Sequence, residues 1–167
     1  MVSSRFTDFV RVLIMNFTNP PTESPKLFCL NYRECDPKKC TGFKLKKLNL
    51  LQMINKINGS LKNSVILNPF AQKELVFLDR DTVLKYGLIV IDCSWKNILN
   101  LKNLKYKNAR KLPPFIAANP TNYGKWEKLS SAEALAAALY ITKFFDLANL
   151  ILSKFSWGNQ FKEINKF

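Results

Sequence analysis

Residues 112–134 of the chain read LPPFIAANPTNYGKWEKLSSAEA. Two prolines hold the approach extended, and the short apolar run 115–118 that follows is typical of an interior strand. The Asn, Pro and Gly residues of segment 119–124 then favour turns. Chains build pockets for small ligands from backbone groups where an apolar run leads into turns and then into a helix. This stretch therefore predicts a pocket.

A helix start follows at Ser130. The Ser130 hydroxyl can accept from the backbone N–H of Glu133, and the Glu133 carboxylate can reach back to the N–H of Ser130, which is a capping box. The alanine-rich run 134–138 lets another backbone lie close to the helix. The pattern predicts a helix over 131–145 that packs on a sheet.

Strand and helix patterns alternate along the rest of the chain. The strand patterns cover residues 10–17, 27–32, 65–67 and 88–91, and the helical patterns cover residues 43–57, 79–85, 97–104 and 147–155. This alternation predicts an α/β fold with a small N-terminal α/β domain over 1–60, including an extension over 1–25, and a second domain over 61–167. The weak boundary is Asn58-Gly59-Ser60.

The run 88–91 is unbroken and rich in β-branched residues, which is typical of a central parallel strand, and Asp92 follows at its end. Ligands of open α/β sheets bind beyond the carboxyl ends of the strands. We therefore expect Asp92 and the 119–124 turns to share one pocket. GxGxxG and P-loop motifs are absent from the sequence, which favours a cofactor without a pyrophosphate.

The chain is strongly basic. Its 26 Lys and Arg against 12 Asp and Glu give a formal net charge of +14, which is typical of proteins that meet a polyanion. The basic residues gather in two segments beside the motifs, and a solvated helix face is the alternative interpretation. We predict RNA contacts at Lys38, Lys39, Lys44, Lys102, Lys105 and Lys107.

Histidine does not occur in the sequence, which excludes Ser-His and Cys-His nucleophilic catalysis. The four cysteines contain no CxxC pair, so we expect no metal site. A secretory signal and a run of apolar residues long enough to cross a membrane are both missing. The sequence predicts a cytoplasmic protein with reduced thiols, away from the membrane.

Three motifs carry a resemblance to a known family. The 112–134 block, the sequence DCSW at 92–95 and the sequence CDPKKCTG at 35–42 stand in the same order as in the small-subunit ribosomal RNA aminocarboxypropyltransferases, and the likeness runs from about Leu27 to Phe145. This resemblance implies that S-adenosylmethionine donates its 3-amino-3-carboxypropyl group to a hypermodified uridine of small-subunit rRNA or of the pre-ribosomal small subunit. It also implies a C-terminal domain like that of the SPOUT methyltransferases, with a deep trefoil knot that nothing in the periodicity reveals. We expect a monomer.

The resemblance also implies the site residues. The family's cofactor contacts fall on Thr41, Ile91, Leu112, Glu127 and Ser131. Most of these residues would act through backbone atoms, whereas the Thr41 hydroxyl suits the ribose or the amino acid tail. The sequence Lys125-Trp126-Glu127 departs from the Arg-Pro-aromatic usual in the family, and Trp126 is the candidate to replace that aromatic ring.

Two residues are candidates for the chemistry. A carboxylate at Asp92 could hold the acceptor base or help to remove its proton, and Trp95 could form a flat wall of the pocket. Their structural alternatives are a helix cap for Asp92 and core packing for Trp95.

Two other functions stay open at this point. A SPOUT-type S-adenosylmethionine-dependent RNA methyltransferase would share the fold and the cofactor, and would differ only in the pose of the cofactor. A non-catalytic rRNA-binding assembly factor would share the basic surface without affinity for the cofactor.

Overall fold

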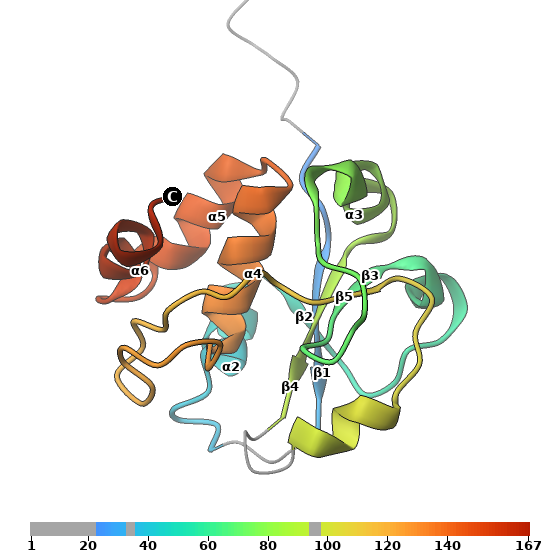
Figure 1. Ribbon diagram of the computed structural model, residues 1–167, viewed down its shortest axis with the longest axis horizontal. Helices are drawn as coiled ribbons and strands as arrows, with labels where there is room; N and C mark the ends of the chain where they lie inside the picture. Colours follow the sequence, from blue (N-terminus) through green and yellow to red (C-terminus); the bar gives the residue numbers. More distant parts are fainter. Residues whose placement is uncertain (1–22, 33–35, 94–97) are drawn as a thin grey trace, which may run out of the picture.

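The computed structural model describes residues 23–32, 36–93 and 98–167 (Figure 1). The predicted strand over 10–17, most of the predicted extension and Trp95 lie outside the described residues. Among the helices that are described, none combines the length and the apolar character that crossing a membrane requires.

One parallel sheet forms the centre of the molecule. Its strands are β1 (Leu27–Asn31), β2 (Gln52–Ile54), β3 (Val65–Leu67), β4 (Leu88–Asp92) and β5 (Ala109–Arg110), in the order β2-β1-β4-β3-β5. Every pairing between them is parallel, so the carboxyl ends of all the strands meet at one edge. The predicted α/β class is confirmed, with β4 in the middle of the sheet, and strands from both sides of residue 60 contribute to it.

The described residues also form five helices and three short 3₁₀ helices around this sheet. The helices are α2 (Thr41–Lys47), α3 (Arg80–Tyr86), α4 (Ser131–Ile141), α5 (Phe145–Ser153) and α6 (Gly158–Asn165), and the 3₁₀ helices are η1 (Gly59–Asn63), η2 (Phe77–Asp79) and η3 (Ile98–Asn103). Figure 1 shows α4, α5 and α6 gathered on one side of the sheet.

Successive side chains of β4 point to opposite faces of the sheet, so this strand contributes to both apolar clusters of the core. Leu88 and Val90 belong to the larger cluster, which includes the alanine face of α4, whereas Ile89 belongs to the smaller cluster on the other face. The same alternation turns Asp92 toward the side of α4 and turns Ile91 toward the smaller cluster. A polar side chain thus lies at the carboxyl end of the central strand, on the side that α4 covers.

The predicted start of α4 is confirmed. The backbone N–H of Glu133 donates to Ser130 Oγ at 3.3 Å, and the N–H of Ser130 donates to Glu133 Oε2 at 2.7 Å. The helix ends at Ile141, before the expected Phe145, because Lys143 takes a φ of 60° and the chain turns there into α5.

The helix predicted over 43–57 is wrong beyond Lys47. Asn49 takes a φ of 57°, which ends the helix, and residues 52–54 instead form the edge strand β2 beside β1. Leu45 is fully buried as the helical spacing required, but Leu48 is 44% exposed.

The interior strand predicted over 115–118 is also wrong. This run makes only one isolated antiparallel bridge, between Ile116 and Trp126. Its backbone groups bond instead to the loop and to side chains: the N–H of Ala117 donates to the carbonyl of Lys125, and the N–H of Ile116 donates to Asn165 Oδ1. Run 115–118 is therefore a loop that hydrogen bonds to Lys125 and Asn165 hold in place.

Candidate functional site

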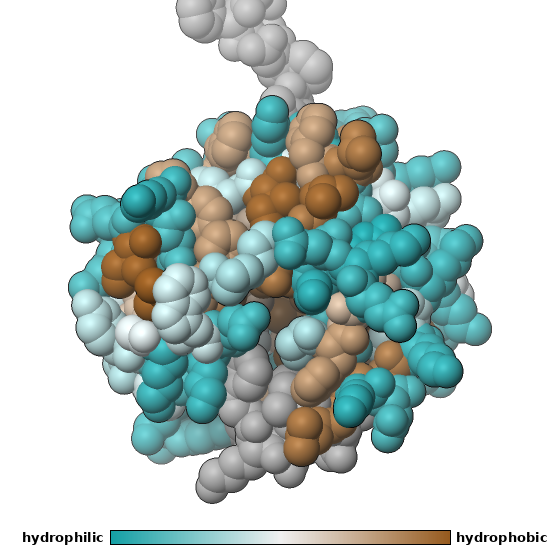
Figure 2. Space-filling view, viewed as in Figure 1, coloured by the Kyte–Doolittle hydropathy of each residue, from teal (hydrophilic) through white to brown (hydrophobic). Residues whose placement is uncertain are grey.

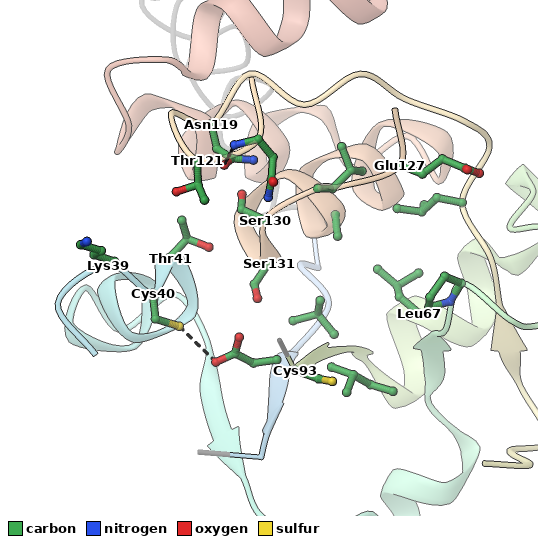
Figure 3. Close-up of a pocket in the computed structure, with 18 of the residues that line it drawn as sticks. Lys39, Cys40, Thr41, Leu67, Cys93, Asn119, Thr121, Glu127, Ser130 and Ser131 are labelled. Atoms are coloured by element: carbon green, nitrogen blue, oxygen red, sulfur yellow. Dashed lines mark hydrogen bonds between the residues drawn. The ribbon is translucent and has the colours of Figure 1, made fainter. Parts of the chain in front are cut away.

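A cavity of about 700 Å³ opens at the carboxyl edge of the sheet. Residues just beyond the ends of β3 and β4, the start of α2, the start of α4 and the 119–122 turn all line it (Figure 3). Figure 2 shows a hollow near the centre of this face, apolar inside and surrounded by hydrophilic residues. The expectation that Asp92 and the 119–124 turns share one pocket is confirmed.

Asp92 is buried at the wall of the cavity, with an exposed fraction of 6%. The Cys40 thiol, which lies directly before α2, donates to Asp92 Oδ2 at 3.1 Å (Figure 3). Burial, together with the hydrogen bond to Asp92 and the charge of that carboxylate, raises the pKa of Cys40 to about 11. The thiol therefore keeps its proton at neutral pH and orients the carboxylate.

Close packing places α2 next to this carboxylate. Gly42 is buried in the first turn of α2, and a Cβ atom there would lie 3.2 Å from Cys29 Sγ of β1. A side chain at this position would fit only if Cys29 or α2 shifted by a few tenths of an ångström. Glycine thus lets α2 present Cys40 and Thr41 to the cavity.

Thr41 joins the starts of α2 and α4. The backbone N–H of Ala132, in the first turn of α4, donates to Thr41 Oγ1 at 3.1 Å. The hydroxyl accepts in this bond, so its own proton is available to an acceptor in the cavity. Ser130 and Ser131 lie beside it in Figure 3. This end of the cavity offers hydroxyl groups and the positive end of the α4 dipole.

Glu133 organises the loop that forms the upper wall. It is fully buried in α4 and accepts hydrogen bonds from the backbone N–H of Ala118, the backbone N–H and side-chain amide of Asn119, and the N–H of Ser130, at 2.7–2.9 Å. The Asn119 amide oxygen in turn accepts from the N–H of Asn122. The sequence identified Glu133 only as a cap, because nothing local shows that its carboxylate also reaches Ala118 and Asn119.

All five predicted cofactor positions line this cavity: Thr41, Ile91, Leu112, Glu127 and Ser131. The side chain of Ile91 packs into the smaller apolar cluster, which suits a contact through its main chain. Among the residues that the structure describes, the N–H groups of Leu112 and Ser131 have no hydrogen-bond acceptor, so both can donate to a ligand. Trp126 is 60% exposed and does not line the cavity.

The predicted RNA-binding lysines divide into two groups. Lys38, Lys39 and Lys44 line the cavity, whereas Lys102, Lys105 and Lys107 are exposed in and after η3. Lys44 is already engaged: its ammonium group donates to the carbonyl of Lys154 at 2.6 Å and lies 4.7 Å from the centre of the Phe155 ring.

Two lining residues, Phe155 and Trp157, were not identified from the sequence. They lie in the connection between α5 and α6, beyond the three sequence motifs that carry the resemblance, and their spacing resembles that of ordinary core residues. Their rings stack with centres 4.8 Å apart. A paired aromatic F-x-W just outside a helix was the available signal.

The described residues form no cluster of three or more His, Cys, Asp or Glu side chains that could hold a metal ion. Cys29 is buried in β1, and Cys40 is bonded to Asp92. The thiols thus act as core and positioning groups within the described part of the chain.

Fold and site together define an α/β protein with a small-molecule cavity at the carboxyl edge of its sheet, next to lysines. A family model described as "Ribosome biogenesis protein, C-terminal" matches residues 65–167, and one described as "Possible Fer4-like domain in RNase L inhibitor, RLI" matches residues 25–58. Within the region of the second match, the described residues form no group of three or more His, Cys, Asp or Glu side chains that could hold a metal ion.

Comparison with known proteins assigns the chain to one family within this class. The chain is 46% identical to the 16S rRNA aminocarboxypropyltransferase of Methanocaldococcus jannaschii, over 84% of this chain and 83% of that one. It is 40% identical to the enzyme of the same name from Methanosarcina acetivorans, over 92% and 87% of the two chains. The solved structure of the SAM-dependent rRNA:acp-transferase Tsr3 from Vulcanisaeta distributa matches with a TM-score of 0.80 and 39% identity, over 85% of this chain and 79% of that one. The chain belongs to the family of the 16S rRNA aminocarboxypropyltransferases.

Proposed function

We propose that this protein transfers the 3-amino-3-carboxypropyl group of S-adenosylmethionine to a uridine of small-subunit rRNA during ribosome biogenesis. One observation carries the proposal. In a chain of this family, the cavity brings together all five expected cofactor positions and the Asp92 carboxylate, although they come from distant parts of the sequence.

The residues of the cavity fit the donor molecule. The free N–H groups of Leu112 and Ser131 can bind carbonyl, carboxylate or ring nitrogen acceptors, and the Thr41 hydroxyl can donate to the polar tail. The apolar side chains of Leu67, Val90 and Leu101 supply a surface for a purine ring. A cavity of about 700 Å³ lies within the usual range for small-molecule sites.

Positioning is the main task of the protein in this reaction. S-adenosylmethionine supplies a sulfonium that activates each of its three attached carbons toward a nucleophile. The protein chooses the transferred group by holding one of these carbons toward the RNA, and correct orientation lowers the barrier substantially. The loop fixed by Glu133 and the helix starts joined by Thr41 provide the rigidity that this choice requires.

We propose that Asp92 acts on the acceptor uridine. A ring nitrogen of the uracil attacks the carbon of the aminocarboxypropyl group that is bonded to sulfur. The new C–N bond forms as the C–S bond breaks, methylthioadenosine leaves, and the nitrogen loses its proton. Asp92 can accept this proton or hold the base by a hydrogen bond, and Cys40 keeps the carboxylate oriented. Trp95, which lies outside the described residues, stays the proposed wall next to the donor.

The basic residues are proposed to hold the RNA backbone. Lys38 and Lys39 lie at the cavity, and Lys102, Lys105 and Lys107 lie exposed on the chain that follows β4. Phosphate contacts from such residues would give affinity and fix the orientation of the strand, while the cavity selects the base.

Two structural features are also part of the proposal. We propose a SPOUT-like trefoil knot in the C-terminal part of the chain, which is supported by the likeness to the family alone. An experimental chain trace without a knot would remove it. A boundary between two domains near residue 60 is supported by the family models, which meet between residues 58 and 65. Limited proteolysis tests the boundary.

We also propose that the protein acts as a cytoplasmic monomer on its rRNA. Its substrate class supports the location, and light scattering with the purified chain tests the oligomeric state. A dimer in solution would remove that part of the proposal.

The decisive first experiment examines the spent donor. Incubation with S-adenosylmethionine and small-subunit rRNA that lacks only the aminocarboxypropyl group should yield methylthioadenosine in amounts equal to the RNA modified. S-adenosylhomocysteine in its place would identify a SPOUT-type methyltransferase. Calorimetry showing no binding of S-adenosylmethionine would identify a non-catalytic assembly factor.

A further inference from the structure

The cavity extends beyond the residues that the donor needs. Its expected donor contacts come from the ends of β4 and β5, the 119–130 loop and the starts of α2 and α4. Phe155 and Trp157 line it from a different element, the connection between α5 and α6. This aromatic pair, Phe155 and Trp157, is not required by the donor site described above.

The geometry of the aromatic pair is that of a stacking surface. The two rings are inclined by 29° with centres 4.8 Å apart, and both side chains are half-buried. They pack against the edge of the core, so the core holds them in place while they still face the cavity. Because Lys44 and Trp157 both cover the Phe155 ring, the indole of Trp157 is the ring that can stack with a flat ligand. Such stacking costs little conformational entropy, since the core holds the indole in place.

Charge beside the aromatic pair indicates the class of ligand. The Lys44 ammonium group lies over the Phe155 ring and is anchored by the Lys154 carbonyl, while the Lys44 side chain remains exposed. Lys38 and Lys39 line the same cavity. A flat ring beside fixed ammonium groups fits a nucleobase attached to a phosphate backbone better than it fits an apolar molecule.

We propose that Phe155 and Trp157 form a base-stacking subsite that binds one nucleobase of the rRNA next to the acceptor site. This inference rests on the proposed function, since it assumes that RNA enters the cavity. Lys44 braces the ring of Phe155 from the side of α2, and its charge attracts the phosphate of the stacked nucleotide. The subsite would hold the strand so that the acceptor uridine stays beside Asp92.

A photochemical crosslink tests the subsite directly. A short single-stranded RNA that carries 5-iodouridine should bind the full chain in the presence of saturating S-adenosylmethionine. Irradiation should then crosslink this base to Phe155 or Trp157, as mapped by mass spectrometry of the tryptic peptides. Crosslinks that map only to other residues, or RNA binding without any crosslink to this pair, would overturn the proposal.

Substitutions supply a second measurement. Trp157→Leu should weaken RNA binding about tenfold, since a stacked base contributes affinity of that order, whereas Trp157→Phe should restore most of it. The matched control is Trp126→Leu, which removes an exposed indole outside the cavity and should leave RNA binding unchanged. Equal RNA affinities for Trp157→Leu and the wild type would also overturn the proposal.

Calorimetry with S-adenosylmethionine separates this inference from the proposed function. Both Trp157 variants should bind the donor as the wild type does, because the donor contacts lie elsewhere in the cavity. If the wild type failed to bind the donor, this result would contradict the proposed function. If the donor bound normally and no base reached the aromatic pair, only the proposed stacking subsite would be contradicted.

Discussion

Asp92 shows how a residue at one strand end can be prepared for a role in proton transfer. It is buried, it closes the central strand, and a protonated thiol from another element orients it. The sequence placed Asp92 at the end of a buried strand and allowed it to be a helix cap. It could not reveal Cys40 as its partner, because the two residues are 52 positions apart.

We predict that Asp92→Asn separates chemistry from binding. The substitution keeps the shape of the side chain and removes its charge. Turnover should fall about 10- to 100-fold if the carboxylate assists proton removal, while donor affinity stays within a few-fold. Single-turnover kinetics and calorimetry measure the two quantities. Unchanged turnover would return Asp92 to a structural role.

Cys40 predicts a pH dependence of stability. Its pKa in the folded protein is about 11, above the ordinary value of 9.0, so the folded state holds the proton more tightly than the unfolded state. The contribution of the thiol is therefore complete below pH 9 and is lost as the pH rises toward 11. Unfolding by urea at pH 8, 9, 10 and 11 should show a smaller loss of stability for Cys40→Ser than for the wild type. Parallel curves for the two proteins would contradict the assignment.

At the scale of elements, α4 and the loop before it act as one unit. We predict that Glu133→Gln lowers the free energy of unfolding by about 2–4 kcal/mol, because an amide group would then face N–H donors in a buried site. Donor affinity should fall with it, since Ala118 and Asn119 lose their anchor. Urea unfolding and calorimetry measure both effects.

Ser130→Ala is the control for that variant. It removes only the cap of the helix and should cost about 1 kcal/mol. Because Ser130 also lines the cavity, donor affinity should fall, but less than it does for Glu133→Gln. If the two variants weakened donor binding equally, the loop anchor at Glu133 would not explain the effect.

Comparison of elements shows what the sequence could predict. Strands β1, β3 and β4 and the capping box of α4 follow from local patterns, because burial and hydrogen bonding there depend on neighbouring residues. The edge strand β2 was missed because its apolar residues also fit helical spacing, and only the exposed edge of β1 selects the strand. Run 115–118 was misassigned because its hydrogen-bond partners, Lys125 and Asn165, lie outside the run, and a local pattern cannot indicate them.

In the candidate site, too, only the features that depend on neighbouring residues or on the family likeness could be predicted. The pocket and its loops could be expected from the direction of the parallel strands, while the five donor positions came from the family likeness. Glu133 as a loop anchor and the aromatic pair could not be expected, since both depend on tertiary contacts between distant elements.

At the scale of the whole molecule, the net charge of +14 predicts a strong dependence of RNA affinity on salt. The double variant Lys38→Gln and Lys39→Gln should reduce the log–log salt slope by about 1.4 if both side chains contact single-stranded phosphates. The matched control is Lys26→Gln with Lys85→Gln, near the opposite edge of the sheet, which should leave the slope unchanged. Equal slopes for both double variants would contradict a phosphate-binding surface at the cavity.

The central claim is that this molecule presents the aminocarboxypropyl group, and not the methyl group, to its RNA. Two samples of S-adenosylmethionine test it, one labelled in the carboxyl carbon and one in the methyl carbon, each incubated with the protein and small-subunit rRNA that lacks only the aminocarboxypropyl group. Our account predicts that the RNA becomes radioactive with the carboxyl label and stays unlabelled with the methyl label. The reverse pattern would contradict the account and identify a methyltransferase with the same fold.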